Sequence, residues 1–96
     1  MSQAELRNNS QAHRYELLDN GKVVAIAEYE LTGDAVRFTH TEVLSGNEGK
    51  GFGSTLAKQA LDHACAENKK LIPVCDFIAG YIQKHPEYQD RVTSDH

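Results

Sequence analysis

Apolar and polar positions alternate over short stretches in the first half of the chain. Residues 13–18, 22–30 and 35–43 are rich in β-branched and aromatic side chains, a pattern typical of strands. Between them stand Asp-Asn-Gly at 19–21 and Thr-Gly-Asp at 32–34, which favour tight turns because Asn and Gly readily adopt positive φ. The pattern predicts an antiparallel meander of three strands.

The second half of the chain changes to a helical period. A helix is predicted over 53–67 from one stripe of apolar residues, namely Leu56, Ala57, Ala60, Leu61, Ala64 and Cys65. A short apolar strand follows at 71–75. Asp76 is placed to cap a last helix, and His85 with Pro86 ends that helix.

The order of these elements constrains how the last strand joins the sheet. A strand, a helix and a further strand form a right-handed crossover, so strand 71–75 is expected to run parallel to strand 35–43. Pro73 lacks an N–H donor, which places this strand at an edge or locally separates it from its neighbour. Residues 1–12 are polar and aperiodic and are expected to form a disordered tail, and 93–96 a loose end.

Composition narrows the class of protein. A chain of 96 residues allows one α+β domain, here over 13–92, and its charge of −4 argues against a nucleic-acid partner. No apolar run approaches the ~20 residues that cross a bilayer, and the first residues do not resemble a signal peptide. We therefore expect a cytoplasmic monomer. Cys65 and Cys75 form no CxxC pair, so neither a metal site nor a disulfide framework is expected.

A glycine-rich loop separates the third strand from the helix. Four of the seven glycines lie within 46–53, and Gly49, Gly51 and Gly53 alternate. Amides at a helix N-terminus can bind a bulky anion closely where no Cβ intervenes. Phe52 follows Gly51, so the Walker A pattern fails, and the G-x-G-x-x-G spacing of dinucleotide sites is absent. The loop predicts a site for another large anion, unless its glycines serve only turns.

Several segments together resemble one known family. Residues 48–53 resemble the [Q/R]-x-x-G-x-[G/A] loop of the GNAT acetyltransferase superfamily, and 38–43, 71–75 and 85–88 look like its small stand-alone members. The resemblance implies a minimal GNAT-like fold that binds acetyl-CoA. The residues it assigns to the cofactor are Val43, Gly49, Lys50, Gly51, Phe52, Gly53 and Ser54.

Two departures from the superfamily pattern affect the expected site. Glu48 stands at the Gln/Arg position, where a carboxylate is unfavourable beside a pyrophosphate unless it points away, although Lys50 offsets its charge. Larger members carry two helices that cover the acceptor between their first strands. This chain has only the turn at 19–21 there, so its acceptor site is expected to be open.

Three side chains are candidates for catalysis. Cys75 precedes a helix N-terminus, which favours the thiolate, and the resemblance places a cysteine at this strand end near the acetyl group. It is either a nucleophile that carries the acetyl group or a small packing residue. His40 and Glu42 are expected on one face with Val36 and Phe38. They act as a base, with His40 able to activate Cys75, or form a partly buried polar pair.

The superfamily's acid tyrosine has no equivalent in this chain. Its position falls on Gln83, which cannot protonate a leaving thiolate, and Tyr81 lies on an apolar stripe. The main hypothesis is an acetyl-CoA-dependent N-acyltransferase acting on an unidentified amine. The alternatives are a non-catalytic CoA-binding module and a protein-interaction domain that uses the strand edge at Pro73.

Overall fold

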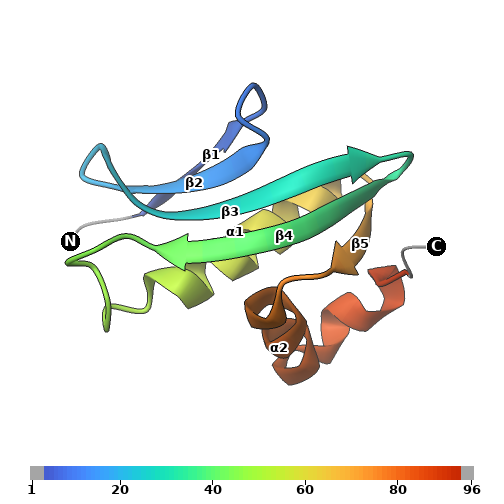
Figure 1. Ribbon diagram of the computed structural model, residues 1–96. Helices are drawn as coiled ribbons and strands as arrows, with labels where there is room; N and C mark the ends of the chain where they lie inside the picture. The colour runs from blue at the N-terminus through green and yellow to red at the C-terminus, as the bar shows by residue number, and fades with distance from the viewer. Residues whose placement is uncertain (1–3, 94–96) are drawn as a thin grey trace.

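The chain folds as one five-stranded sheet with helices on one side (Figure 1). The computed structural model describes residues 4–93. In order across the sheet, the strands are β1 (Glu5–Asn9), β2 (Arg14–Asp19), β3 (Lys22–Thr32), β4 (Ala35–Val43) and β5 (Lys70–Pro73). The helices are α1 (Phe52–Ala66), α2 (Asp76–Lys84) and the short 3₁₀ helix η1 (Pro86–Arg91). The α+β class is as predicted.

The meander has four antiparallel strands, where the sequence indicated three. Residues 5–9, expected within a disordered tail, pair with β2 as strand β1, so that expectation is wrong for them. The polar composition of β1 hid it, because only Leu6 of this edge strand packs against the core. Residues 1–3 and 94–96 lie outside the described residues. Thr93, expected in a loose end, donates its N–H to the carbonyl of Leu71 at 2.9 Å.

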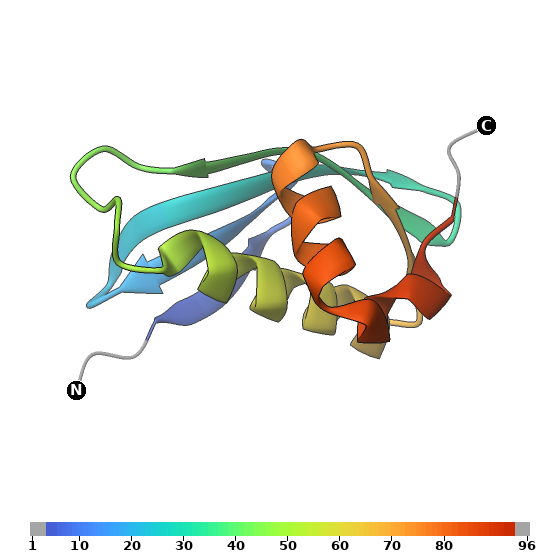
Figure 2. The same ribbon diagram turned by 90° about the horizontal axis from the view of Figure 1, so that it is seen from below.

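Both main helices pack on the same face of the sheet, as Figure 2 shows. We call this the helix-covered face and the other the open face. Aromatic and aliphatic side chains from both layers fill the core, among them Tyr15, Leu17, Phe38, Leu56, Leu61, Ile78 and Ile82. β5 pairs in parallel with β4 at the edge of the sheet, where the missing N–H of Pro73 is tolerated.

A β-bulge interrupts the pairing of β4 with β3. His40 lies opposite Glu28, whereas Phe38 lies opposite the next residue of β3, Tyr29. Thr39 is therefore an extra residue on β4 with no partner of its own. Because side chains alternate between the two faces of a strand, one extra residue reverses the alternation beyond it.

This reversal corrects the expected facing of His40 and Glu42. Before the bulge, Phe38 is completely buried on the helix-covered face. After it, Thr41 and Val43 take that face, since Thr41 contacts Cys75 and Val43 borders the first turn of α1. His40 and Glu42 lie on the open face, so they do not share a face with Phe38 as the uninterrupted pattern predicted.

Candidate active site

The glycine loop is shaped by left-handed backbone. Gly46, Gly49 and Gly51 have φ of 88°, 80° and 76°, values that L side chains rarely adopt. Gly51 is the N-cap of α1 and ends the loop with φ 76° and ψ 12°. The amides of the first helical turn have no acceptor within the helix, and no acidic side chain occupies that turn. The loop and this turn can therefore bind an anion through backbone N–H groups.

Glu48 does not oppose such an anion. Its carboxylate accepts a hydrogen bond from the backbone N–H of Gly46 at 2.9 Å, within the loop itself. The carboxylate is held by the loop backbone, while the amides of Phe52, Gly53 and Ser54 stand at the start of α1. The departure at Glu48 is therefore compatible with anion binding at the helix N-terminus.

Beside the loop, β4 has an edge that no described strand covers. β5 pairs with β4 only as far as Phe38 and Pro73. The N–H groups of Val74 and Cys75 then both donate to the carbonyl of Phe38, at 3.1 and 2.9 Å, and the chain turns into α2. We call residues 39–43, which have β3 on one side only, the free edge of β4.

Cys75 lies next to this free edge. Cys75 is the N-cap of α2 and makes no side-chain capping bond. The sequence predicted Asp76 for the N-cap, but Asp76 is the first residue of the helix. The Sγ atom lies 3.5 Å from Thr41 Oγ1. Burial raises the pKa of the Cys75 thiol, but the Thr41 hydroxyl and the nearby backbone amides of Ile78 and Phe77 outweigh it, so the pKa lies below its ordinary value.

The other cysteine has the opposite environment. Cys65 lies on α1 and packs against the hydrophobic core. Burial raises the pKa of its thiol above the ordinary value, and this effect exceeds that of the Arg91 charge, which lowers it. The two thiols are therefore distinguishable chemically, and Cys65 provides an internal control for Cys75.

His40 and Glu42 form a pair that does not reach Cys75. His40 Nε2 lies 3.2 Å from Glu42 Oε1, and both side chains are about half exposed on the open face. Cys75 contacts Thr41 on the helix-covered face. The structure thus brings together two of the three catalytic candidates and separates the third from them by the width of the β4 backbone.

A groove between α1 and α2 begins at the helix turn that follows the loop. It has a volume of about 420 Å³, and its lining residues are Ser54, Asp76, Phe77, Gly80, Tyr81, Lys84 and His85. Tyr81 stacks on His85 here, with ring centroids 3.9 Å apart. The sequence indicated His85 only as the end of a helix and did not single out Lys84, because their place in this groove depends on how α1 and α2 pack.

Lys50 lies on another side of the loop. It lines a second cavity, of about 440 Å³, with Ala4, Asp19, Phe52 and Thr55. Ser54 lines the groove between the helices instead. The residues predicted to bind the cofactor therefore surround the N-terminus of α1, and only some of them face the groove.

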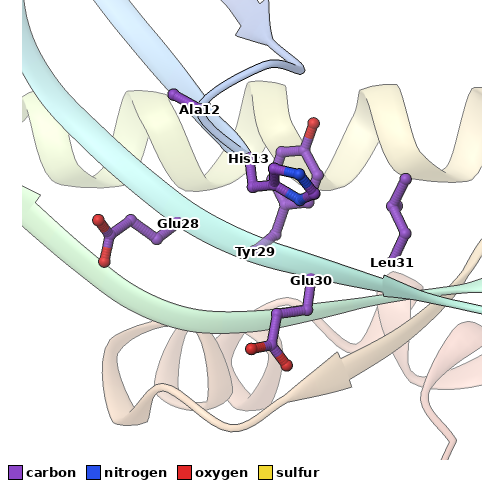
Figure 3. Close-up of a pocket in the computed structure, with 6 residues that line it drawn as sticks. All are labelled: Ala12, His13, Glu28, Tyr29, Glu30 and Leu31. Atoms are coloured by element: carbon purple, nitrogen blue, oxygen red, sulfur yellow. The ribbon is translucent and has the colours of Figure 1, made fainter.

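A hollow lies at the edge of β3 beside the start of β2, as Figure 3 shows, and has a volume of about 400 Å³. His13 lies near the ring of Tyr29, with ring centroids 6.3 Å apart, while Glu28 and Glu30 point away from that ring. Glu28 both lines this hollow and pairs across the strands with His40. Glu28 therefore connects the hollow with the His40–Glu42 pair.

The described residues form neither a metal-binding cluster nor a membrane-spanning helix. Residues 4–93 contain no group of three or more His, Cys, Asp or Glu placed to hold a metal ion. No helix in that range is long and apolar enough to cross a membrane. The candidate site contains backbone amides, a thiol, a hydroxyl and, on the other face of β4, the His40–Glu42 pair.

Comparisons with known proteins agree with this geometry. A family model described as GCN5-related N-acetyltransferase matches residues 14–91. The fold is also similar to the NMR solution structure of a GCN5-like candidate N-acetyltransferase from Staphylococcus aureus, with a TM-score of 0.70 and 26% sequence identity. That similarity covers 100% of this chain and 94% of the other. Since the family model matches most of the chain, the protein belongs to the GCN5-related N-acetyltransferase family.

Proposed function

We propose that the protein transfers an acetyl group from acetyl-CoA to an amine. Its family supports acyl transfer in general. The observation that carries the finer proposal is the glycine loop, whose left-handed residues lead into the uncapped N-terminus of α1 beside the free edge of β4. This arrangement provides amides for a pyrophosphate and, next to them, a strand edge for the arm that carries the thioester.

Three parts of the site suit three parts of coenzyme A. The amides of 49–54 suit its pyrophosphate, because backbone N–H groups and the helix dipole both favour negative charge. The backbone of the free edge, at Thr41 and Val43, suits the amides of the pantetheine arm. The groove between the helices carries the cation of Lys84, which suits a further phosphate. These assignments place the acetyl end near Cys75.

A covalent route through Cys75 accounts for the thiol environment. Its sulfur attacks the thioester carbonyl carbon, the bond from that carbon to the sulfur of CoA breaks, and CoA leaves as a thiolate that takes a proton. The amine then attacks the acetyl carbon on Cys75. The bond to Cys75 breaks, its thiolate is restored, and the amine loses one proton.

The His40–Glu42 pair is proposed to receive the amine proton through a water or through the acceptor itself at the free edge of β4, because the pair does not reach Cys75 directly. The pair lies on the open face, where no described helix covers the approach of an acceptor. The hollow adjoins it through Glu28, whose carboxylate favours a cationic amine over an anionic acceptor, whereas Glu30 of the same hollow is paired with Arg37 at 2.7 Å. The same pair can act as base in a direct attack of the amine on acetyl-CoA, without an acetyl-cysteine.

Tyr81 does not replace the missing acid of the superfamily. It lines the groove and stacks on His85, four residues further along the chain, and its position on α2 is more than a helical turn beyond Cys75. Proton transfer to the leaving thiolate is therefore assigned to water. A module that binds CoA without catalysis is the competing proposal, and the assay below separates the two.

Intact-protein mass spectrometry after incubation with acetyl-CoA tests the covalent route. We expect one added acetyl group on the wild type and on Cys65→Ala, and none on Cys75→Ala. Release of free CoA in the presence of a panel of primary amines tests turnover. Binding of acetyl-CoA without either acetylation or CoA release would support the non-catalytic module and contradict the proposed transferase.

A further inference from the structure

We propose that Thr41 is a positioning residue that holds the Cys75 sulfur for attack on the thioester. The proposal rests on the covalent route of the proposed function. It assigns a role to a residue that the sequence pattern did not single out. Its basis is the contact between the Thr41 hydroxyl and the Cys75 sulfur across the free edge of β4.

The sulfur of Cys75 is influenced from two elements. From β4, Thr41 Oγ1 lies 3.5 Å away and accepts its hydrogen bond. From α2, the backbone amides of Phe77 and Ile78 lower the pKa of the thiol, but the Cys75 side chain makes no capping hydrogen bond to the helix. Thr41 is the one described side chain with a hydrogen bond to this sulfur. Helix amides alone leave the sulfur free to rotate about χ1, whereas a contact from a second element restricts it to one rotamer.

A hydroxyl suits both protonation states of the sulfur. The thiol donates to Oγ1, as in the structure. After deprotonation, the hydroxyl of Thr41 rotates and donates its own hydrogen to the thiolate. No backbone movement is required for the exchange. Thr41 can therefore stabilise the reactive form without losing its contact with the resting form.

The bulge explains why Thr41, and not its neighbour, has this role. Thr39 is the extra residue, and its hydroxyl donates to the carbonyl of Glu28 at 3.4 Å on the opposite side of β4. Without the bulge, Thr41 would project to the open face, and His40 and Glu42 would take the helix-covered face instead. The chain thus contains two threonines two residues apart, of which only Thr41 touches the sulfur.

The groups that act on the Cys75 sulfur are neutral. They are the Thr41 hydroxyl and amide and the amides of Phe77 and Ile78. Of the charged groups near it along the chain or on the strand, Asp76 is exposed, and His40 with Glu42 projects from the open face. Loss of the hydroxyl should therefore change the titration of the thiol, while loss of the imidazole should not.

Alkylation of Cys75 at different pH values tests the proposal. Full-length Thr41→Val, Thr41→Ser and Thr39→Val are compared in a Cys65→Ala background, with iodoacetamide as the probe and mass spectrometry as the readout. We expect Thr41→Val to raise the midpoint pH and to slow alkylation at pH 7 by about three- to tenfold, the usual effect of one lost hydrogen bond. Thr41→Ser should restore the wild-type profile, and Thr39→Val should retain it.

The same variants separate this inference from the proposed function. Thr41→Val should bind acetyl-CoA like the wild type and lower kcat rather than raise KM. An unchanged alkylation profile in Thr41→Val, or an equal change in Thr39→Val, would overturn the role of Thr41. If Thr41→Val does not fold, Thr41→Ala is used and judged on the same profile. Failure of the wild type to form acetyl-Cys75 would overturn the covalent route and with it the catalytic purpose assigned to Thr41. The alkylation profile does not depend on acetyl-CoA, so it would still show separately whether Thr41 controls the state of the sulfur.

Discussion

Gly53, in the first turn of α1, lies directly against the ring of Phe77, in the first turn of α2. A Cβ on Gly53 would stand 3.0 Å from Phe77 Cζ and 3.5 Å from Val43 Cγ2. The residue thus lets α1, α2 and the end of β4 approach one another at the loop. Glycine in this position is explained by packing, because its φ lies outside the left-handed region.

Gly53→Ala should therefore not bring the usual gain in helix stability. An added Cβ must displace the ring of Phe77, which offsets the ~1 kcal/mol by which alanine exceeds glycine in a helix. Gly80→Ala is the matched control, because a Cβ there meets nothing within 4 Å. We expect urea denaturation to show a gain of about 0.5–1 kcal/mol for Gly80→Ala only. An equal gain in both variants would contradict the contact with Phe77.

Gly51→Val should abolish acetyl-CoA binding in a protein that still folds. A β-branched side chain at φ 76° strains the backbone and occupies the approach to the α1 amides. Gly33→Val is the control, since Gly33 has φ 60° in a distant turn and also has open space around it. Both should lose about 1–2 kcal/mol of stability. Calorimetric titration should find lost affinity in Gly51→Val only; unchanged affinity there would remove the loop from the site.

His40→Ala should leave the reactivity of Cys75 unchanged. The two residues lie on opposite faces of β4, and the imidazole is hydrogen-bonded to Glu42. The alkylation profile of Cys75 should match that of the wild type, while amine acetylation should slow by about 10²-fold if the pair is the base. A raised midpoint pH for Cys75 in His40→Ala would show direct activation by the histidine and contradict the arrangement described above.

Glu16 should make the stability of the fold depend on pH. Burial raises its pKa, but hydrogen bonds from Arg7, Arg14 and Asn9, together with the Arg7 charge, outweigh it and lower the pKa to about 2. A carboxyl with a lowered pKa stabilises the fold above its unfolded value of 4.5, and this contribution is lost as the pH falls towards 2.

Glu16→Gln tests this cluster. The variant should be less stable than the wild type by about 2 kcal/mol at pH 7, because two arginines lose their charged acceptor. The difference should shrink between pH 4.5 and pH 2, where the wild type also loses its carboxylate. Urea denaturation at three pH values measures it. A difference that is constant with pH would show that the network does not depend on ionised Glu16.

The sequence predicted the strands, the loop and the helices wherever a repeating pattern marks them. It missed β1, because the stretch ELRNN contains only one apolar side chain. Two of its polar side chains, Arg7 and Asn9, instead donate hydrogen bonds to the buried Glu16, a contact that no local pattern indicates. It also missed the bulge, since the residues around Thr39 include neither glycine nor proline and alternate normally. That omission placed His40 and Glu42 on the wrong face.

The candidate site could likewise be predicted only where composition or position along the chain marks it. Glycine composition identifies the loop, and the position of Cys75 before a helix identifies a favoured thiolate. Neither pattern contains the partner of the sulfur. Thr41 lies 34 residues before Cys75 in the chain and reaches it only through the register shift in β4 and the pairing of β4 with β5. The groove at Lys84 depends in the same way on how two helices pack.

Titration of the ¹⁵N-labelled protein with acetyl-CoA, followed by amide chemical shifts, tests the central claim most directly. Binding through backbone N–H groups at the N-terminus of α1 predicts the largest shifts at residues 49–54, with smaller shifts at Thr41, Cys75 and Phe77. The amides of the turn at Gly33, at the opposite end of β4, should remain unchanged. An absence of shifts at millimolar acetyl-CoA, or a set of shifts centred away from the loop, would contradict the proposed cofactor site.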